Sequence, residues 1–167
     1  MTTTVMPVRA EVVVGIADLQ VGRPPTKTIV THALGSCIGV FAWDPQTHAA
    51  ACLHFMLPKA ESSADAGDRE PFKYADTGLP KLIRAVAPDK VSASRLRIVA
   101  CGGATMNGDS AMFRIGQRNI AALRQFAWHF GFVLSAHDLG GNSPRTARID
   151  LTSGRVTVDS GSRSTLL

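Results

Sequence analysis

The chain has 167 residues and a mass of 17.7 kDa, which is typical of a single domain. Hydrophobic residues make up 45% and charged residues 19%, so the composition excludes a disordered or fibrous protein. No apolar run approaches the ~18 residues of a membrane span, and the N-terminal residues lack the pattern of a signal peptide. Three cysteines at these spacings fit neither a disulfide framework nor a CxxC zinc site, so we expect a cytoplasmic protein with reduced thiols.

The net charge of +5 is unevenly distributed along the chain. Residues 1–80 carry 6 basic and 8 acidic side chains, whereas residues 81–167 carry 12 basic and 5 acidic ones. A basic C-terminal half favours an acidic partner, because charge steers the encounter. No short window is dominated by Lys or Arg and aromatic residues are only 6%, so the sequence does not indicate a nucleic-acid surface.

The first half of the chain is predicted to be rich in strands. Apolar, β-branched stretches predict them at residues 11–16, 27–31, 38–43 and 49–54, with a turn at 44–47 joining the last two. The polar segment 59–73 predicts an exposed loop. A helix is expected from about Leu79 to Val86, capped by Asp76 or Thr77, with Pro80 in its first turn.

The second half alternates between strands and one long helix. A compact apolar run predicts a buried strand at 96–101, and the pattern of residues 115–130 predicts a helix that Gly131 ends. Its buried face is expected to carry Ile115, Ile120, Leu123, Ala127 and Phe130. Further strands are predicted at 132–137, 147–151 and 155–158, followed by a tail at 160–167. Helices between groups of strands indicate a layered α/β domain.

Cys37 is the first candidate for chemistry. It follows Gly35 and Ser36 in a turn between two predicted strands, where a thiol is accessible and backbone amides are able to hold an oxyanion. A buried, inert cysteine is the ordinary alternative.

His54 strengthens the case for Cys37. Pairing about the 44–47 turn places it within a few residues of the level of Cys37, so its imidazole can serve as the base for the thiol. A core histidine bonded to backbone is the alternative. Thr31, at the end of the preceding strand, offers a hydroxyl to orient the second ring nitrogen, although threonine is also an ordinary strand residue. Cys52 and His54 share a strand face and invite a metal site with His48 or His32, but no fourth ligand stands at a recognisable spacing.

Several short motifs occur together in this chain, in the order THALGSCIGVFAWDP, LHFMLP, YADTGLPKLI, CGGATM, IGQRN, DLGGNSPR and TSGRV. Over about residues 9–158 this order resembles the CheD family, the chemoreceptor glutamine deamidases of bacterial chemotaxis. The resemblance implies a nucleophile at Cys37, its histidine partner at His54 and a third member at Thr31. It also implies layered β-sheets flanked by helices, similar to the cysteine-hydrolase fold of toxin-type glutamine deamidases.

The resemblance further implies a reaction that needs no metal or organic cofactor. The Cys37 thiolate would attack the side-chain amide of a receptor glutamine, while backbone amides around Ser36 and Cys37 hold the oxyanion, with Ser36 and Gly35 expected in the oxyanion or substrate-binding loop. His54 would protonate the departing ammonia and then activate water, and Thr31 would orient His54. We expect one domain over residues 1–167, a monomer, with the cytoplasmic helices of chemoreceptors as its protein substrate.

Other functions stay open on the same residues. CheD-like proteins also bind and stimulate CheC-type phosphatases, so the chain could act mainly as a regulatory partner. A cysteine protease or transglutaminase using the same triad is a further alternative. Three features depart from the family pattern and bear on partner and substrate preference: the 59–73 loop, His137 in front of DLGG, and the tail after Val158.

Overall fold

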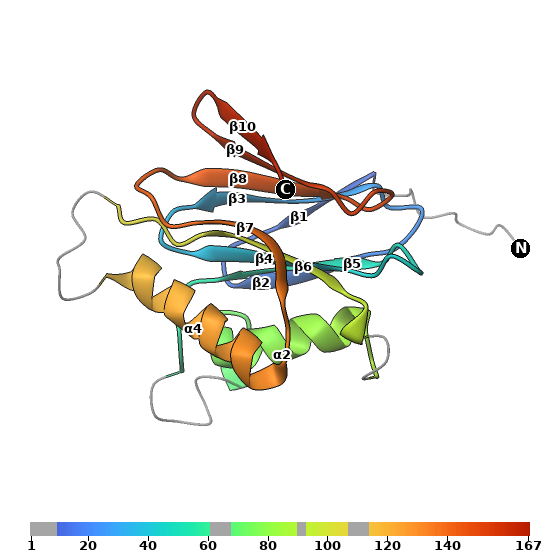
Figure 1. Ribbon diagram of the computed structural model, residues 1–167, viewed down its shortest axis with the longest axis horizontal. Coiled ribbons are helices and arrows are strands. Elements are labelled where there is room, and N and C mark those ends of the chain that lie inside the picture. The colour runs from blue at the N-terminus through green and yellow to red at the C-terminus, as the bar shows by residue number, and fades with distance from the viewer. Residues whose placement is uncertain (1–9, 61–67, 90–92, 107–113) are drawn as a thin grey trace, which may run out of the picture.

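The computed structural model describes residues 10–60, 68–89, 93–106 and 114–167. It has three layers, in which two five-stranded sheets stack face to face and helices α2 (Ala75–Val86) and α4 (Ile115–Phe130) cover the outer face of one of them (Figure 1). The predicted α/β class with layered sheets is therefore confirmed, and both of these helices lie on the same side of the sheets.

Sheet A is the sheet without helices. It contains, in spatial order, β1 (Glu11–Val14), β3 (Thr28–Leu34), β8 (Arg145–Asp150), β9 (Val156–Ser160) and β10 (Arg163–Leu166). Sheet B contains β2 (Asp18–Gly22), β5 (Ala50–Phe55), β4 (Ile38–Trp43), β6 (Arg97–Gly102) and β7 (Leu134–Leu139). The β1–β3 and β6–β7 pairs are parallel and the other pairs antiparallel, so both sheets are mixed.

Sheet B is buried on both faces, because sheet A covers one face and the helices the other. Every residue of β4 and β5 is accordingly buried, which explains why these strands are continuous apolar runs rather than alternating ones. One core fills the space between the sheets, with Phe41 and Ile149 among its members. The other lies between sheet B and the helices and includes Leu82 and Leu123.

Several predicted elements are confirmed with shifted ends, and the predictions for the segment after Val14 and for the C-terminal tail are wrong. The predicted strand 11–16 stops at Val14, and an unpredicted strand, β2, follows in the other sheet. The chain makes this change of sheet through a turn in which Ala17 takes a positive φ of 55°. The predicted tail is instead the second strand of a hairpin, since β10 pairs with β9 across Gly161.

The two helices also differ from prediction in detail. Helix α2 begins at Ala75 after Tyr74, so neither Asp76 nor Thr77 is its cap and Pro80 lies beyond its first turn. Helix α4 has the predicted bounds and ends at Gly131 in the left-handed conformation. Phe130 does not join its buried face, because this residue is 54% exposed.

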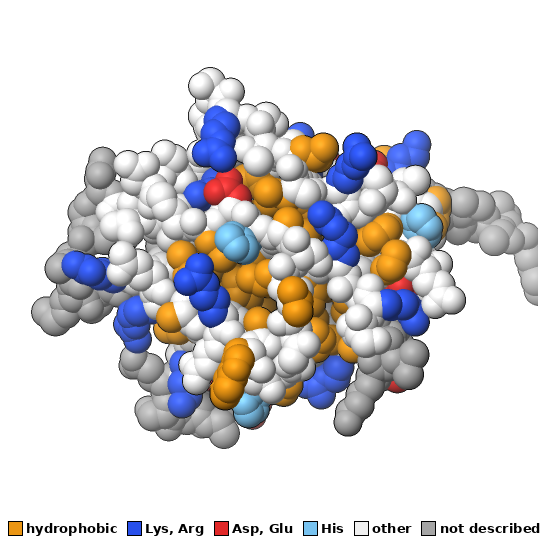
Figure 2. Space-filling model, viewed as in Figure 1, with side chains coloured by type: hydrophobic (Ala, Val, Ile, Leu, Met, Phe, Trp, Pro, Cys, Tyr) orange, Lys and Arg blue, Asp and Glu red, His pale blue; other side chains and the backbone are white. Residues whose placement is uncertain are grey.

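Of the predicted 59–73 loop, residues 61–67 lie outside the described residues. Among the described residues, no helix is long and apolar enough to cross a membrane. On the face seen in Figure 2, Lys and Arg side chains are more common than Asp and Glu and are spread over the surface, as the distribution of charge in the sequence suggested.

Candidate active site

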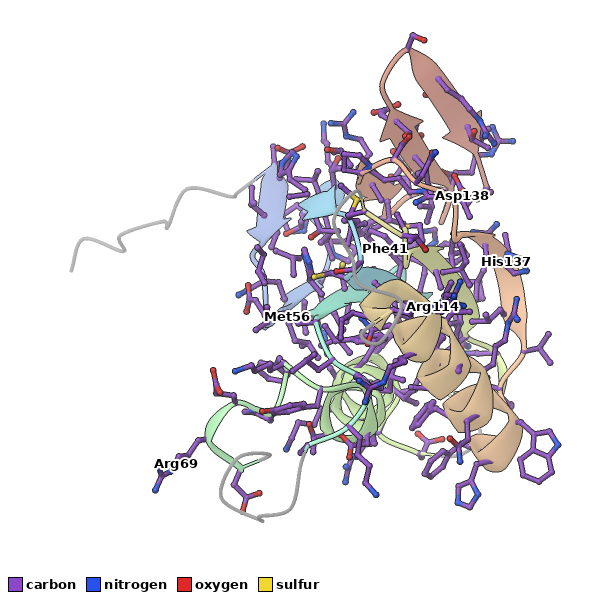
Figure 3. The ribbon with its side chains drawn as sticks, turned by 90° about the vertical axis from the view of Figure 1, so that its left-hand side faces the viewer. Phe41, Met56, Arg69, Arg114, His137 and Asp138 are labelled. Atoms are coloured by element: carbon purple, nitrogen blue, oxygen red, sulfur yellow. The ribbon has the colours of Figure 1, made fainter. Side chains whose placement is uncertain are left out.

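The candidate active site lies where the chain crosses from sheet A to sheet B. Strand β3 belongs to sheet A and β4 to sheet B, so the loop at residues 35–37 bridges the two layers. The predicted hairpin is confirmed, since β4 pairs antiparallel with β5 and Gly39 lies opposite His54. Cys37 precedes Gly39 by two residues, so the thiol and the imidazole come from neighbouring strands near the same end of sheet B. Figure 3 shows this end of the molecule, where β5 ends just before Met56 and α4 begins after Arg114.

Gly39 allows the two sheets to approach each other at the site. A Cβ atom at this position would lie 3.1 Å from Cδ1 of Leu34 and 3.2 Å from Cγ2 of Thr31. Both distances are shorter than ordinary van der Waals contact, so a side chain here would push β3 away from β4. The glycine therefore leaves the space in which Thr31 of sheet A reaches His54 of sheet B.

Thr31 and His54 are joined directly across the two sheets. Oγ1 of Thr31 lies 2.9 Å from Nδ1 of His54, and both residues are fully buried. The Thr31 hydroxyl donates to the carbonyl oxygen of Val14 at 3.0 Å. Because its single proton is used there, Oγ1 accepts a hydrogen bond from Nδ1–H of His54. The expected contact between Thr31 and His54 is present in the structure.

This hydrogen bond determines which ring nitrogen of His54 is free to act. With the proton on Nδ1, Nε2 carries a lone pair, and Nε2 is buried without a hydrogen-bond partner among the described residues. Burial lowers the pKa of His54 from 6.5 to about 4, although the Asp18 carboxylate acts in the opposite direction. The imidazole is therefore neutral near pH 7, in the form that accepts a proton.

Cys37 is the accessible thiol of the three. It is half-buried and unpaired, whereas Cys52 and Cys101 are fully buried. Burial raises the pKa of the Cys37 thiol, and its own backbone amide opposes this effect. Within the described part of the chain the Cys37 sulfur makes no hydrogen bond to His54. The free protein thus holds a neutral thiol near a neutral base rather than a preformed ion pair.

The loop that carries Cys37 is fixed by its carbonyl oxygens. The amides of Ala104 and Gly103 donate to the carbonyls of Gly35 and Cys37, each at 2.8 Å. The carbonyl of Ser36 accepts from the Asn119 side chain at 2.9 Å. All three carbonyls are thus bonded to neighbouring elements, which restrains the backbone of the loop.

The backbone amides of this loop differ in whether they already have a hydrogen-bond acceptor. The Gly35 amide donates to the carbonyl of Ala33 at 3.0 Å, so in the free protein it already has an acceptor. Ala33 has a positive φ of 58°, which turns the chain so that this bond closes. No carbonyl or side-chain oxygen of the described residues accepts from the Ser36 and Cys37 amides, and the Cys37 amide faces its own sulfur, so both amides are available to an oxyanion formed at that sulfur.

Asn119 is a site residue that the sequence analysis did not single out, although it lies in the IGQRN motif. Its side-chain amide donates to the carbonyl of Ser36 and, at 2.8 Å, to the carbonyl of Met56. Ser36 belongs to the loop of Cys37, and Met56 follows the strand of His54. From the first turns of α4, Asn119 therefore ties together the two segments that carry the thiol and the imidazole.

The DLGGNSPR motif forms a second loop at this end of the molecule. Arg145, nearly buried, donates to Asp138 at 3.1 Å and to the carbonyl of Gly140 at 2.7 Å. The carbonyl of Gly141 accepts from the Thr105 amide. His137 is exposed on β7, on the other side of α4 from Met56 (Figure 3), so this departure from the family pattern lies apart from Thr31 and His54.

The predicted metal alternative is not assembled by the fold. Cys52 packs in the core between the sheets, while His48 lies near the carbonyl of Leu151 and His32 near the hydroxyl of Thr146. Among the residues that the structure describes, no three His, Cys, Asp or Glu side chains are close enough together to hold a metal ion.

A half-buried thiol, a neutral imidazole with a free nitrogen and a hydroxyl bonded to the ring are the groups that a site of the cysteine-nucleophile type requires. Comparison with known proteins identifies the family. The family model for CheD chemotactic sensory transduction matches residues 56–160. The chain is 42% identical over 150 residues to a probable chemoreceptor glutamine deamidase CheD 2 of Anaeromyxobacter dehalogenans, covering 90% of this chain and 94% of the relative.

Further relatives come from distant organisms. A probable chemoreceptor glutamine deamidase CheD of Solibacter usitatus is 40% identical over 146 residues, which are 87% of this chain and 86% of that protein. A protein of the same name from Pyrococcus abyssi is 39% identical over 152 residues, covering 89% and 90% of the two chains. The chain belongs to the CheD family, as its motifs predicted.

Proposed function

We propose that this protein is a chemoreceptor glutamine deamidase acting in chemotaxis, with Cys37 as nucleophile, His54 as general acid and base, and Thr31 as the residue that orients His54. The observation that carries the proposal is the bond between Thr31 and Nδ1 of His54, which leaves Nε2 unpaired on the strand that pairs with Gly39, two residues after Cys37. The names of the relatives supply the substrate class, a glutamine of a chemoreceptor.

The first half-reaction forms a thioester. Nε2 of His54 takes the proton of the Cys37 thiol, and the sulfur attacks the side-chain carbonyl carbon of the glutamine. The S–C bond forms while the C=O bond opens to an oxyanion. When the oxyanion collapses, the C–N bond breaks, and the proton held by His54 leaves with ammonia.

The second half-reaction releases glutamate. Nε2 of His54 takes a proton from a water molecule, whose oxygen attacks the thioester carbon. The S–C bond then breaks and the proton returns to the sulfur of Cys37. One water is consumed and one ammonia is formed for each glutamine converted. In both halves the amides of Ser36 and Cys37 bind the oxyanion, a contribution of about 3 kcal/mol for each well-placed donor.

Two finer expectations remain predictions within this proposal. The similarity to the cysteine-hydrolase fold of toxin-type deamidases accords with the stacked sheets and their layer of helices. Binding of a CheC-type phosphatase rests on family membership alone.

The test is deamidation of a purified chemoreceptor cytoplasmic fragment, followed by peptide mass spectrometry and by ammonia release. We expect Cys37→Ser to abolish the conversion of glutamine to glutamate while the fold is kept, because the change removes little volume. Iodoacetamide should label Cys37 first, since the other two thiols are fully buried, and activity should fall in step with that labelling.

Cys52→Ala is the matched control, because Cys52 lies on the strand of His54 but in the core. It is expected to lose some stability and to keep its turnover. An active Cys37→Ser variant, or equal labelling of all three cysteines, would contradict the assignment of the nucleophile.

A further inference from the structure

A carboxylate lies opposite the imidazole on the neighbouring strand. Asp18 of β2 pairs with His54 of β5 in the antiparallel register of sheet B. Residues directly opposite in such a pair point to the same face of the sheet, with Cβ atoms about 5 Å apart. That face looks toward sheet A and Thr31, so the Asp18 side chain and the imidazole share the space between the two sheets.

The Asp18 carboxylate is held in place by its own segment. It accepts hydrogen bonds from the Leu19 amide at 2.8 Å and the Gly15 amide at 3.2 Å, and the Gln20 side chain lies 3.1 Å from both of its oxygens. All of these partners are neutral, and no Lys or Arg of the described residues forms a salt bridge with Asp18. Its negative charge is therefore fixed in position and is not cancelled by a local ion pair.

The reaction places a positive charge on His54 that its other neighbours cannot balance. Thr31 is a neutral hydroxyl. Apart from Cys37, Asp18 and the ring itself, the titratable groups on this face of sheet B are the thiols of Cys52 (β5) and Cys101 (β6), the guanidinium of Arg97 (β6) and the carboxylate of Asp138 (β7). The charge of Asp138 is balanced by its salt bridge with Arg145 of β8. Burial raises the pKa of both thiols, that of Cys101 to about 12, so both are neutral near pH 7. Among the described residues facing the ring from β3, β4, β5 and β6, none carries a negative charge at that pH.

We propose that Asp18 is a positioning residue that acts through His54, by stabilising the imidazolium form that arises when the Cys37 thiol gives up its proton. The inference rests on the proposed function. In a triad whose third residue is a carboxylate, that charge stabilises the imidazolium, but Thr31 is neutral and cannot do so. The proposal gives this electrostatic role to Asp18 of β2. Burial lowers the pKa of His54 and the Asp18 charge raises it, which is the direction that the proposal requires.

The experiment measures the ring titration of His54 by NMR in the full chain without substrate, together with kcat and KM for the receptor fragment. Asp18→Asn keeps the size and an acceptor oxygen but removes the charge. It is expected to lower the pKa of His54 further and to reduce kcat about tenfold with KM little changed, as loss of one screened charge at this range predicts. The pH at which Cys37 alkylation reaches half its maximum rate should rise at the same time.

Three further variants make the test specific. Asp159→Asn removes a half-exposed carboxylate of β9, so it changes the net charge equally and should leave His54 unchanged. Asp18→Glu should restore most of kcat. Should Asp18→Asn not fold, Asp18→Glu and Asp18→Gln give the same comparison of charged with neutral, because their side chains have the same length.

An Asp18→Asn protein with lower stability but an unchanged His54 titration and alkylation profile would overturn the proposal, because Asp18 would then only support its own turn. A failure of the proposed function looks different. In that case Cys37→Ser would retain deamidation, while the titration of His54, which needs no substrate, would still decide the role of Asp18.

Discussion

Thr31 is the one described residue that forms a side-chain hydrogen bond with His54, so it offers the sharpest test at the level of one residue. Thr31→Val keeps the branched shape and deletes the bond to Nδ1. We expect a loss of about 1–3 kcal/mol of stability, because a buried donor is left unpaired, and a clear fall in the rate of ammonia release. His54→Ala removes the acid and the base together, and it should lose ~10²–10⁴-fold or more. Initial rates for both variants, with circular dichroism to confirm folding, give the comparison.

Thr31→Ser is the matched control, since it keeps the hydroxyl and should retain most of the activity. A Thr31→Val enzyme as fast as the parent would remove Thr31 from the site, and a fast His54→Ala enzyme would refute the mechanism.

At the scale of single residues, part of the candidate site could be predicted from the sequence. Cys37, His54 and Thr31 could be proposed together because their chemistry, their spacing and the family motifs agree. Asn119 was not, since an asparagine within a helix gives no sign that its amide bridges two carbonyls 83 and 63 positions away. For Gly35, expected in the oxyanion or substrate-binding loop, the sequence did not show that its amide bonds the carbonyl of Ala33, because the left-handed turn at Ala33 is not visible in the sequence.

At the scale of elements, local pattern predicted the strands and the hairpin but not which sheet each strand joins. The short turn at 44–47 fixes β4 beside β5, so the position of His54 near Cys37 followed from the sequence. Strand β2 was missed because it follows β1 after a three-residue turn and mixes apolar with polar residues. With β2 unrecognised, Asp18 had no place beside His54, and the pairing of β2 with β5 is set by long-range packing.

Gly39 gives the prediction that belongs to this scale, because it controls the spacing of two strands. In Gly39→Ala the new methyl group would crowd Leu34 and Thr31, and we expect this to lower the free energy of unfolding by about 1–3 kcal/mol. We expect the same pressure to displace Thr31 from His54 and to lower kcat well beyond the loss of folded protein. Urea unfolding and ammonia release, measured on the same preparations, separate the two effects.

Gly22→Ala is the control for packing alone. A Cβ atom there would meet Leu151 at 3.0 Å and Ile29 at 3.1 Å in the same core, but at the other end of β5 from His54. It should cost similar stability and keep kcat. If both variants lose activity equally, Gly39 has no specific influence on the site.

Over the whole molecule, the stacking of the sheets decides both the chemistry of the site and the stability of the fold. The layered class was predictable from the order of elements, whereas the burial of Thr31 and His54 between two sheets was not, because it depends on which faces meet. The C-terminal hairpin was likewise missed, since the segment Arg163–Leu166 lacks the apolar pattern of a core strand. Its strand pairs along β9 at the edge of sheet A, where such a pattern is not needed.

Burial of His54 links the global stability of the protein to pH. In the unfolded chain the imidazole binds a proton below its ordinary pKa of 6.5, but in the folded protein it does so only below about 4. As pH falls from 6.5 toward 4, protons therefore bind the unfolded state preferentially, and this group alone removes about 3 kcal/mol from the free energy of unfolding. Above pH 6.5 its contribution is constant. Urea unfolding at a series of pH values should show this decline in the wild type and a smaller one in His54→Gln, whereas His137→Gln, which changes an exposed histidine, should follow the wild type. Parallel curves for wild type and His54→Gln would mean that His54 titrates normally in the folded protein, and that the neutral base assigned to it is wrong.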